Sequence, residues 1–429
     1  MDLYYLRKLY LDAPLWTKKI YASIPPVIRL GYQYFKYRKR IKKNYRFNPS
    51  ISDISELTKK FNFYSLFYDK ELNDWESIPL IDKKISQEYF YSLKKSRFDF
   101  IAITGGVTGS PAKFLQTRKV WSKEQAFVHD FFARHGCSHR TLRACFRGGD
   151  FSRLDKDVYW IENPLNNEIQ FSPFHLSPDT AIEYVNELVN RKIEYLHGYP
   201  SVFIQFASYI LKENIVLKTK MKCIFLVSEG FSKNEYMLLK NVFNCEIASF
   251  YGHSERLIFG EFCEGEFGYK LSRAYGYWEL VDEGGNVITK KGVEGELVGT
   301  NLDNEAMPLV RYKTGDFTQY IDYSRGIVAP ISGKWNGKYL LGKSNEKITL
   351  TALNIHSEEL NFIEIIQFIQ EKPGHVHINY SASKKVNTLP IEQLLTKRVG
   401  FTISFVFNEE GEFIRSHRGK IPLLVSRIV

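Results

Sequence analysis

The segment most suited to chemistry is a loop of small and hydroxyl residues at positions 104–113, which reads Thr-Gly-Gly-Val-Thr-Gly-Ser-Pro-Ala-Lys. It follows an apolar run, residues 98–103, that predicts a strand. Glycines let the backbone approach a ligand closely, and successive N–H groups together with hydroxyls can surround a phosphate. The loop is therefore a candidate phosphate-binding loop, although a tight turn without a ligand has the same composition.

A second candidate segment is Tyr-Gly-His-Ser-Glu, residues 251–255, directly after a predicted strand at 246–250. A carboxylate at the end of a strand, beside a glycine that permits close approach, suits Mg²⁺ carried by nucleotide phosphates. Glu255 is the candidate ligand, and the alternative is an ordinary surface acid. His253 is a candidate base or ligand, although a single histidine usually is neither.

Two further segments could contact a nucleotide. Residues 311–316 read Arg-Tyr-Lys-Thr-Gly-Asp, and Asp316 could accept two hydrogen bonds from a ribose diol, unless the segment is only a hairpin turn. Near the C-terminus, Lys420 follows a glycine among basic residues. A flexible ammonium there could stabilise a negative transition state, and the alternative is a basic tail.

Residues 337–344 formally match the phosphate-loop pattern GxxxxGK[ST]. That pattern requires a helix to begin at its Lys-Ser end, so that the helix N-terminus faces the phosphates. Residues 345–351 instead alternate like a strand. We therefore do not interpret this match as a nucleotide site.

The elements that position these segments form an α/β pattern. Between residues 98 and 250, predicted strands alternate with helical stretches at 122–135 and 178–191, and after residue 267 short antiparallel strands follow at 277–281, 296–300 and 317–321. A turn at 283–286 separates two strands. We predict a large domain over residues 1–341, with a basic and aromatic N-terminal segment at 1–60, and a small α+β domain over residues 342–429.

Composition bounds the class of protein. The chain has 429 residues, 44% hydrophobic and 25% charged, which excludes wholesale disorder and fibrous structure. Five cysteines without a CxxC pair make a disulfide framework or a Cys-rich zinc site improbable. Because no signal pattern and no run of about 18 to 20 apolar residues occurs, we expect a soluble, cytoplasmic protein.

The net charge of +11 suits a nucleic-acid binder, a protein that rests on anionic membrane, or an enzyme with anionic substrates. Residues 25–46 interleave Lys and Arg with aromatic residues. They are interpreted as a solvated helix whose aromatic face docks on the protein, with peripheral contact to the inner face of a membrane or to a lipid-linked sugar as an alternative. Basic residues with aromatics cluster only here, so we expect no nucleic-acid partner.

The order of the segments is more specific than any one of them. The loop at 104–113 is followed by Gly-Tyr-Pro-Ser at 198–201, Ser-Glu-Gly at 228–230, the segments at 251–255 and 311–316, and the terminal Gly-Lys. This order resembles the adenylate-forming superfamily, which includes acyl-CoA synthetases and peptide-synthetase adenylation domains. Within it, the chain looks most like the phenylacetate–CoA ligase branch, and closest to CapK-type proteins of capsular polysaccharide biosynthesis.

The resemblance implies a large domain of β-sheets flanked by helices and a small mobile C-terminal domain. It implies ATP and Mg²⁺, with CoA as a further candidate cofactor. Thr108, Glu255 and Lys420 would be catalytic, with Glu255 the Mg²⁺ ligand, and Lys343 and Asn345 would form the hinge between the domains. The residues that would bind ATP or AMP are Thr104, Gly105, Gly106, Thr108, Gly109, Lys113, Ser228, Glu229, Gly230, Tyr251, Gly252, His253, Ser254, Arg311, Asp316 and Lys343.

The function that the resemblance implies is an AMP-forming ligase. It would activate a small carboxylate and transfer the acyl group to an amine or a sugar of a surface-polysaccharide precursor. Ala352 stands where thioester-forming relatives often have Gly, which weighs against the alternative CoA acceptor, and Val107 replaces a hydroxyl of the usual loop. A further alternative is an adenylyltransferase or a scaffold of a capsule assembly complex. Glu255 and Asp316 are both expected to be exposed in the cleft.

Overall fold

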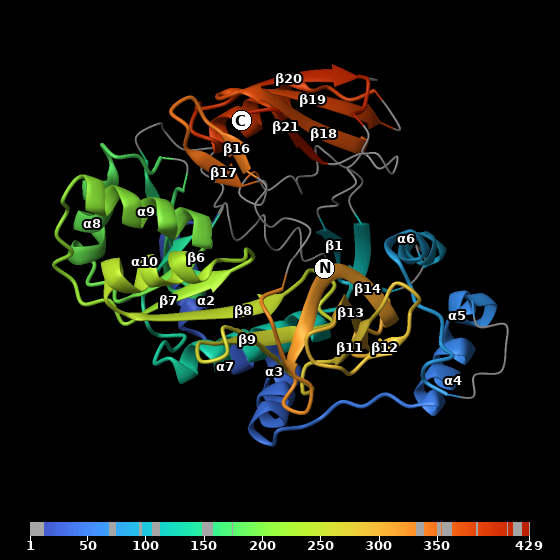
Figure 1. Ribbon diagram of the computed structural model, residues 1–429. Helices are drawn as coiled ribbons and strands as arrows, with labels where there is room; N and C mark the ends of the chain where they lie inside the picture. Colours follow the sequence, from blue (N-terminus) through green and yellow to red (C-terminus); the bar gives the residue numbers. More distant parts are fainter. Residues whose placement is uncertain are drawn as a thin grey trace.

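The computed structural model describes residues 13–67, 74–93, 97–104, 112–147, 158–173, 175–331, 339–349, 353, 363–382, 385–409, 411–414 and 423–428. These residues form a mixed α/β protein in which one large sheet is flanked by helices, as the sequence predicts (Figure 1). None of the helices among them is both long enough and apolar enough to cross a membrane.

The N-terminal part is helical. Its helices are α2 (Leu15–Ser23), α3 (Pro26–Lys42), α4 (Ile51–Lys60), α5 (Asn62–Phe67) and α6 (Lys83–Ser92). Pro26 is the first residue of α3, where a missing N–H costs no hydrogen bond. Tyr34 and Tyr37 of α3 are buried against α7 (Arg118–Arg134), so one face of this basic helix docks on the protein, as expected.

The loop at 104–113 connects two strands of a hairpin. β1 (Phe100–Thr104) pairs antiparallel with β2 (Ala112–Gln116). The hairpin fixes both ends of the loop, whose residues 105–111 lie outside the described part of the chain.

The parallel half of the main sheet consists of β3, β5, β6, β7 and β8, with β4 antiparallel at its edge. Helices α8, α9 and α10 cover one face, and α7 with α3 covers the other. The bounds are β3 (Arg143–Phe146), β4 (Trp160–Asn163), η1 (Pro164–Asn166), β5 (Glu168–Phe171), α8 (Ala181–Asn190), β6 (Tyr195–Gly198), α9 (Pro200–Lys212), β7 (Cys223–Val227), α10 (Lys233–Phe243) and β8 (Glu246–Gly252).

The antiparallel half continues the same sheet beyond β8. It contains β9 (Phe259–Cys263), β10 (Gly268–Leu271), β11 (Tyr277–Val281), β12 (Val287–Ile288), β13 (Glu294–Asn301), β14 (Leu309–Asp322) and β15 (Ile327–Val328). The prediction of a separate strand at 317–321 is wrong. Those residues are the second half of β14, which runs on because β13 pairs with it on both sides of a bulge.

The C-terminal part has its own sheet and its own core. Its elements are β16 (Tyr339–Leu341), β17 (Lys347–Thr349), β18 (Ile363–Lys372), β19 (His375–Ala382), α11 (Leu389–Arg398), β20 (Ser404–Glu409) and β21 (Leu424–Ser426). The sheet order is β20-β19-β18-β21, and α11 packs on it. β16 and β17 form a hairpin, so a strand follows residues 337–344 where a phosphate loop would need a helix. This confirms the prediction that the formal match is not a phosphate loop.

Candidate active site

The carboxyl ends of adjacent parallel strands meet at one edge of the sheet. Residues 228–230 follow β7, and Tyr251 and Gly252 end β8. In open α/β sheets this edge is the usual place for ligands. Ser228 has a φ of 69°, a conformation that costs free energy for a non-glycine residue and that concentrates at functional sites.

The loop after β7 is also tied to α9. Glu229 Oε2 accepts a hydrogen bond from the backbone N–H of Ser201 (3.2 Å), which belongs to the first turn of that helix. Two of the predicted segments, 198–201 and 228–230, are therefore in direct contact. The contact brings a carboxylate to a helix N-terminus, an arrangement that the helix dipole stabilises.

Two tyrosine–carboxylate pairs bring Glu255 and Asp316 together. Tyr251 of β8 donates its hydroxyl to Asp316 Oδ2 (2.7 Å). In return, Tyr312 of β14 donates to Glu255 Oε1 (3.3 Å) in the loop after β8. The pairs join β8 to β14, two strands that are not hydrogen-bonded neighbours in the sheet. Each phenol lies close enough to both carboxylates to be affected by their charges, so the two carboxylates predicted to hold metal and ribose share one site.

These contacts shift the acidity of both phenols. Burial first, and then the nearby negative charges, raise the pKa of Tyr251 and Tyr312 well above the usual value. Both tyrosines therefore stay protonated and act as hydrogen-bond donors at every physiological pH.

Asp316 projects from a β-bulge in β14. The register between β13 and β14 shifts here, and Gly315 has a φ of 73° that favours glycine. Glu296 of β13 holds the bulge, because its Oε1 accepts from the Gly315 N–H (2.8 Å) and its Oε2 pairs with Lys313 Nζ (3.0 Å). Thr314 donates its hydroxyl to the Leu297 carbonyl (2.8 Å), and these contacts orient Asp316.

Glu255 is buried, with 9% of its surface exposed, which corrects the expectation of an exposed carboxylate. His253 Nδ1 lies 3.0 Å from Glu255 Oε2, and His253 Nε2 accepts from the Ile258 N–H (3.1 Å). Because Nε2 is an acceptor, the ring is neutral with its proton on Nδ1, and that proton is donated to Glu255. Asp316, by contrast, is partly exposed, as expected.

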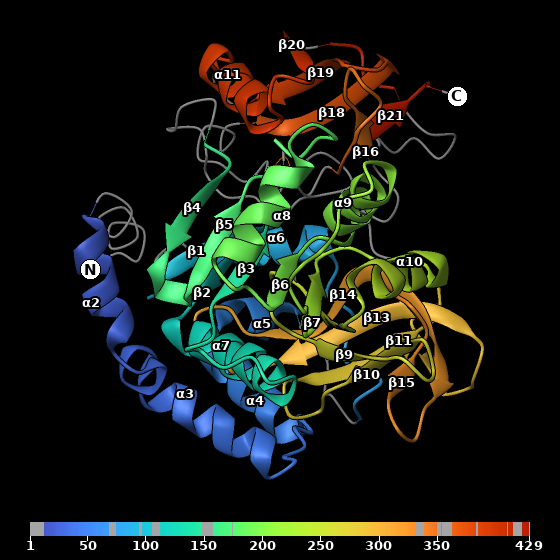
Figure 2. The ribbon, with the colours of Figure 1, turned by 90° about the vertical axis from the view of Figure 1, so that its left-hand side faces the viewer.

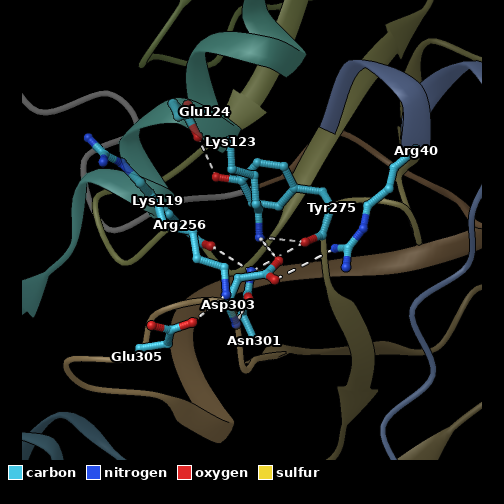
Figure 3. A network of polar contacts seen from close by, with 9 residues as sticks. All are labelled: Arg40, Lys119, Lys123, Glu124, Arg256, Tyr275, Asn301, Asp303 and Glu305. Atoms are coloured by element: carbon cyan, nitrogen blue, oxygen red, sulfur yellow. Dashed lines mark hydrogen bonds and ion pairs between the residues drawn. The ribbon is translucent and has the colours of Figure 1, made fainter. Parts of the chain in front are cut away.

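A buried polar network supports the loop that carries Glu255 (Figure 3). Asn301 Nδ2 donates to the carbonyls of Arg256 (3.2 Å) and Tyr275 (3.2 Å), and Arg256 has a φ of 56°. Tyr275 donates its hydroxyl to Glu124 of α7. The strained backbone next to Glu255 is thus held from the side of α7 and β13.

Lys123 lies at the centre of this network. Its Nζ contacts the Tyr275 carbonyl (2.6 Å) and Asp303 Oδ2 (3.3 Å), and Arg40 of α3 reaches the other oxygen of Asp303 (3.6 Å). Burial lowers the pKa of Lys123 to about 8, although Asp303 opposes the shift. For Asp303, burial would raise the pKa, but Lys123, Arg40 and the Tyr37 hydroxyl outweigh burial and hold the pKa below its usual value.

The stem of the glycine-rich loop adjoins these carboxylates. Gln116 of β2 donates Nε2 to the Ser254 carbonyl (2.6 Å), and the Phe114 ring packs edge-on against Tyr312, with ring centroids 5.8 Å apart. The backbone N–H of Lys113 is fixed by Gln87 of α6 (2.9 Å). The stem of the loop therefore packs beside the segment that carries Glu255. Gly105, Gly106, Thr108 and Gly109 lie outside the described residues.

The C-terminal candidates are only partly described. Lys343 and Asn345 lie at the turn between β16 and β17, where Asn345 has a φ of 63°. The Lys343 N–H donates to the Thr402 carbonyl (3.0 Å), so this turn is attached to the C-terminal sheet. Lys420 lies outside the described residues.

Arg311 differs from the expectation that it binds nucleotide. Its guanidinium is 1% exposed and pairs with Glu279 (Nε–Oε1, 2.6 Å), and it donates to the carbonyls of Glu76 and Ile78. A group enclosed in this way ties β14 to β11 and to the segment before α6. Its role in the described structure is to hold the strand that carries Asp316.

Sequence reasoning missed Tyr312, Gln116 and Glu296. Tyr312 belongs to the segment at 311–316, so its motif was found but its contact with Glu255 was not. Glu296 stands in a Gly-Glu-Leu segment that also resembles the family, but its contact with Gly315 was not predicted. Gln116 carried no signal, because it acts on a segment far away in the chain.

The oxygen donors of this site fit Mg²⁺. Magnesium prefers one or two carboxylates together with substrate phosphates, and Glu255 offers a carboxylate that is already oriented by His253 and Tyr312. Two other clusters among the described residues, His135 with Cys223 and Glu246, and Cys145 with Glu168 and His197, contain nitrogen and sulfur donors. Neither cluster includes a predicted site residue.

Comparison with known proteins adds one full-length relative. Protein CapK of Staphylococcus aureus is 25% identical over an alignment of 454 positions that covers 97% of this chain and 96% of that protein. No protein-family model matches the chain. The resemblance to CapK-type proteins that the motifs indicated is therefore confirmed over nearly the whole length.

Solved structures similar to this chain include two of 2-hydroxyisobutyryl-CoA ligase. One, in the postadenylation state with an acyl-AMP, has a TM-score of 0.48 at 13% identity and covers 89% of this chain and 91% of that one. The other, with 2-HIB-AMP and CoA in the thioesterification state, has a TM-score of 0.49 at 14% identity and the same coverage.

Proposed function

Starting from the likeness of this chain to CapK-type proteins of the adenylate-forming superfamily, we propose that it is an AMP-forming ligase that activates a carboxylic acid with ATP. The observation that carries the proposal is the reciprocal pairing of Tyr251 with Asp316 and of Tyr312 with Glu255, beside the stem of the glycine-rich loop. A buried carboxylate for a metal and a partly exposed carboxylate for a diol, placed together, are what a nucleoside triphosphate needs.

The reaction has two steps. A carboxylate oxygen of the acid attacks the α-phosphorus of ATP, the bond to the bridging oxygen of pyrophosphate breaks, and an acyl-adenylate forms. The acceptor then attacks the acyl carbon, and AMP leaves. Most of the catalysis would come from positioning and charge stabilisation.

In this proposal Asp316 accepts the ribose hydroxyls, and residues 228–230 with Tyr251 and Gly252 border the adenine and the acyl group. Glu255 would hold Mg²⁺, which offsets negative charge on the phosphates. Residues 104–109 and Lys113 would contact the phosphates, with Thr108 closest to the reaction. Lys420 would bridge the acid and the α-phosphate.

The remaining parts of the proposal concern domains and acceptor. The large domain would span residues 1–341 and the small domain residues 342–429, with Lys343 and Asn345 as the hinge between the two half-reactions. We favour an amine or sugar acceptor in surface-polysaccharide synthesis in the cytoplasm, because Ala352 replaces a glycine common in thioester-forming relatives. CoA is the alternative acceptor. A further alternative is an adenylyltransferase, which would use the same nucleotide site, or a non-catalytic scaffold of a capsule assembly complex, which would not need it.

The test is pyrophosphate release from ATP and Mg²⁺, measured with uronic, amino, aryl and short fatty acids, each with CoA, with an amine or with neither. Release with one acid would establish adenylation, and the acceptor that sustains turnover would identify the second step. Glu255→Gln should lower release by about two orders of magnitude or more, since it removes a metal-binding charge. Glu264→Gln, which changes an exposed glutamate on the β9–β10 turn, is the matched control.

Normal release by Glu255→Gln would overturn the metal assignment. If ATP binds but no acid supports release, the chain is an adenylyltransferase or a scaffold instead.

A further inference from the structure

The positive charge of this protein is concentrated in its N-terminal arm, defined here as α2 and α3 with their flanks at residues 13–49. The arm contains ten Lys or Arg and no Asp or Glu, so it supplies ten of the eleven net positive charges of the chain. Charge that a nucleotide site needs would be distributed around that site. Here it is placed on helices that carry none of the residues proposed to bind nucleotide, metal or acid.

The outer side of the arm is apolar as well as basic. Trp16 and Ile20, one turn apart on α2, are 65% and 62% exposed, and Tyr32 and Phe35 on α3 are 74% and 54% exposed. No residue of α2 is buried. Exposed side chains of this size, gathered on two consecutive helices, indicate an interaction site rather than scattered surface residues.

Helical spacing separates this outer stripe from the docked face. Tyr34 and Tyr37 point to α7 and are buried, whereas Tyr32, Phe35 and Lys39 follow one another at intervals of three and four residues on the opposite side. Figure 2 shows α2 and α3 running along the margin of the molecule, outside α7. The outer stripe is therefore presented to the surroundings while the inner face holds the arm in place.

Some of the basic residues of the arm form ion pairs and others do not. Lys19, Arg38 and Arg40 are paired with Glu162, Asp130 and Asp303 of the protein. Lys36, Lys39, Lys42 and Lys43 have no carboxylate within ion-pair distance among the described residues. These unpaired ammonium groups lie next to Tyr32 and Phe35, so their charge is available to a partner.

We propose that the outer stripe of α2 and α3 docks the protein on an anionic bilayer surface. Aromatic rings settle at the level of the lipid headgroups, and neighbouring lysines are attracted to anionic lipids. A nucleic acid would match the charge of the arm but would not cover the exposed aliphatic Ile20. A second copy of the arm would repel the first, because the arm contains no Asp or Glu to pair with its lysines. The inference does not depend on the proposed ligase activity.

The test is co-sedimentation of the full chain with vesicles of phosphatidylcholine alone or mixed with phosphatidylglycerol. We expect several-fold more protein on the mixed vesicles, with partial loss at high salt because screening weakens the lysine attraction. Tyr32→Ser combined with Phe35→Ser, and Lys39→Glu combined with Lys43→Glu, should each reduce binding to the level of pure phosphatidylcholine.

The matched controls change exposed residues in the last turn of α9 and in the segment that follows it. Leu211→Ser with Val216→Ser, and Lys218→Glu with Lys220→Glu, should bind like the unchanged protein. Thermal unfolding of every variant checks that the fold is retained. Equal binding to both vesicles, binding that the arm variants do not change, binding to DNA in place of vesicles, or concentration-dependent dimerisation that Phe35→Ser abolishes would each overturn the proposal.

Discussion

At the scale of single residues, His253 orients the carboxylate on which the proposed metal site depends. Its Nε2 is fixed by the Ile258 N–H, which leaves Nδ1 to donate to Glu255. A ring held at both nitrogens cannot rotate freely, so it fixes one oxygen of Glu255. Partners that orient a metal ligand in this way commonly affect metal affinity strongly.

We therefore expect His253→Ala to raise the Mg²⁺ concentration for half-maximal pyrophosphate release about 10- to 100-fold. Saturating Mg²⁺ should restore most of the rate, because Glu255 itself remains. The amide of His253→Asn can donate to Glu255 in place of Nδ1, so its Mg²⁺ midpoint should lie between those of the unchanged protein and His253→Ala. A Mg²⁺ titration of the three proteins decides this, and an unchanged midpoint in His253→Ala would refute the positioning role.

The sequence was informative about the two carboxylates and silent about their partners. Glu255 and Asp316 stand in segments whose order is specific, so they could be predicted. The burial of Glu255 could not be predicted, because it depends on Tyr312 of β14, which lies far from Glu255 in the chain. Arg311 shows the same limit, since its partner Glu279 lies on another strand.

At the scale of elements, the bulge in β14 decides where Asp316 points. Glu296 uses one carboxylate oxygen for the Gly315 N–H and the other for Lys313. The first contact holds the backbone of the bulge. The second is a partly exposed ion pair, which contributes less to the stability of the fold. The two roles can be separated by mutation.

We expect Glu296→Ala to lower the free energy of unfolding by about 1–3 kcal/mol, since it leaves a partly buried N–H without its charged acceptor. It should also raise the KM for ATP, because Asp316 loses its support. Lys313→Met keeps the Gly315 contact, so it should change stability by less than about 1 kcal/mol. Denaturant unfolding measures the free energy of unfolding, and ATP titration of pyrophosphate release measures the KM. Equal losses of stability in Glu296→Ala and Lys313→Met would contradict a role for the bulge.

Several strands and helices were predictable because their apolar periodicity is local. The helix at 118–134 and the strand at 223–227 were found within a few residues. The continuity of β14 was not, because a Thr-Gly-Asp sequence is typical of a turn and only pairing with β13 shows that it is a bulge.

At the scale of the whole molecule, α/β alternation indicated the fold class. It did not indicate that the parallel and antiparallel halves join in one sheet, which has thirteen strands in the described part of the chain. The join is made where β9 pairs with β8, a contact that no local pattern specifies. Lys123 of α7 contacts the Tyr275 carbonyl and Asp303 in the loop after β13 (Figure 3). Asp303 in turn pairs with Arg40 of α3, so the network links α7, α3 and this loop. A single buried ammonium therefore connects three parts of the protein.

This position makes stability depend on pH in a defined direction. The pKa of Lys123 is about 8 in the folded protein and about 10.4 in an unfolded chain. Between these values the unfolded chain binds more protons, so this group makes the free energy of unfolding rise with pH from about 8 to 10.4. Below pH 8 both states are protonated and the group contributes no slope.

Lys123→Met and Lys123→Arg both remove the titration, the first without a charge and the second with a permanent one. Each should show a smaller rise in the free energy of unfolding between pH 8 and 10 than the unchanged protein, whatever its stability at pH 7. The measurement is denaturant unfolding at several pH values, and the difference between proteins cancels the titration of other groups. If the slopes coincide, the buried ammonium does not titrate in this window, and Asp303 keeps Lys123 charged throughout.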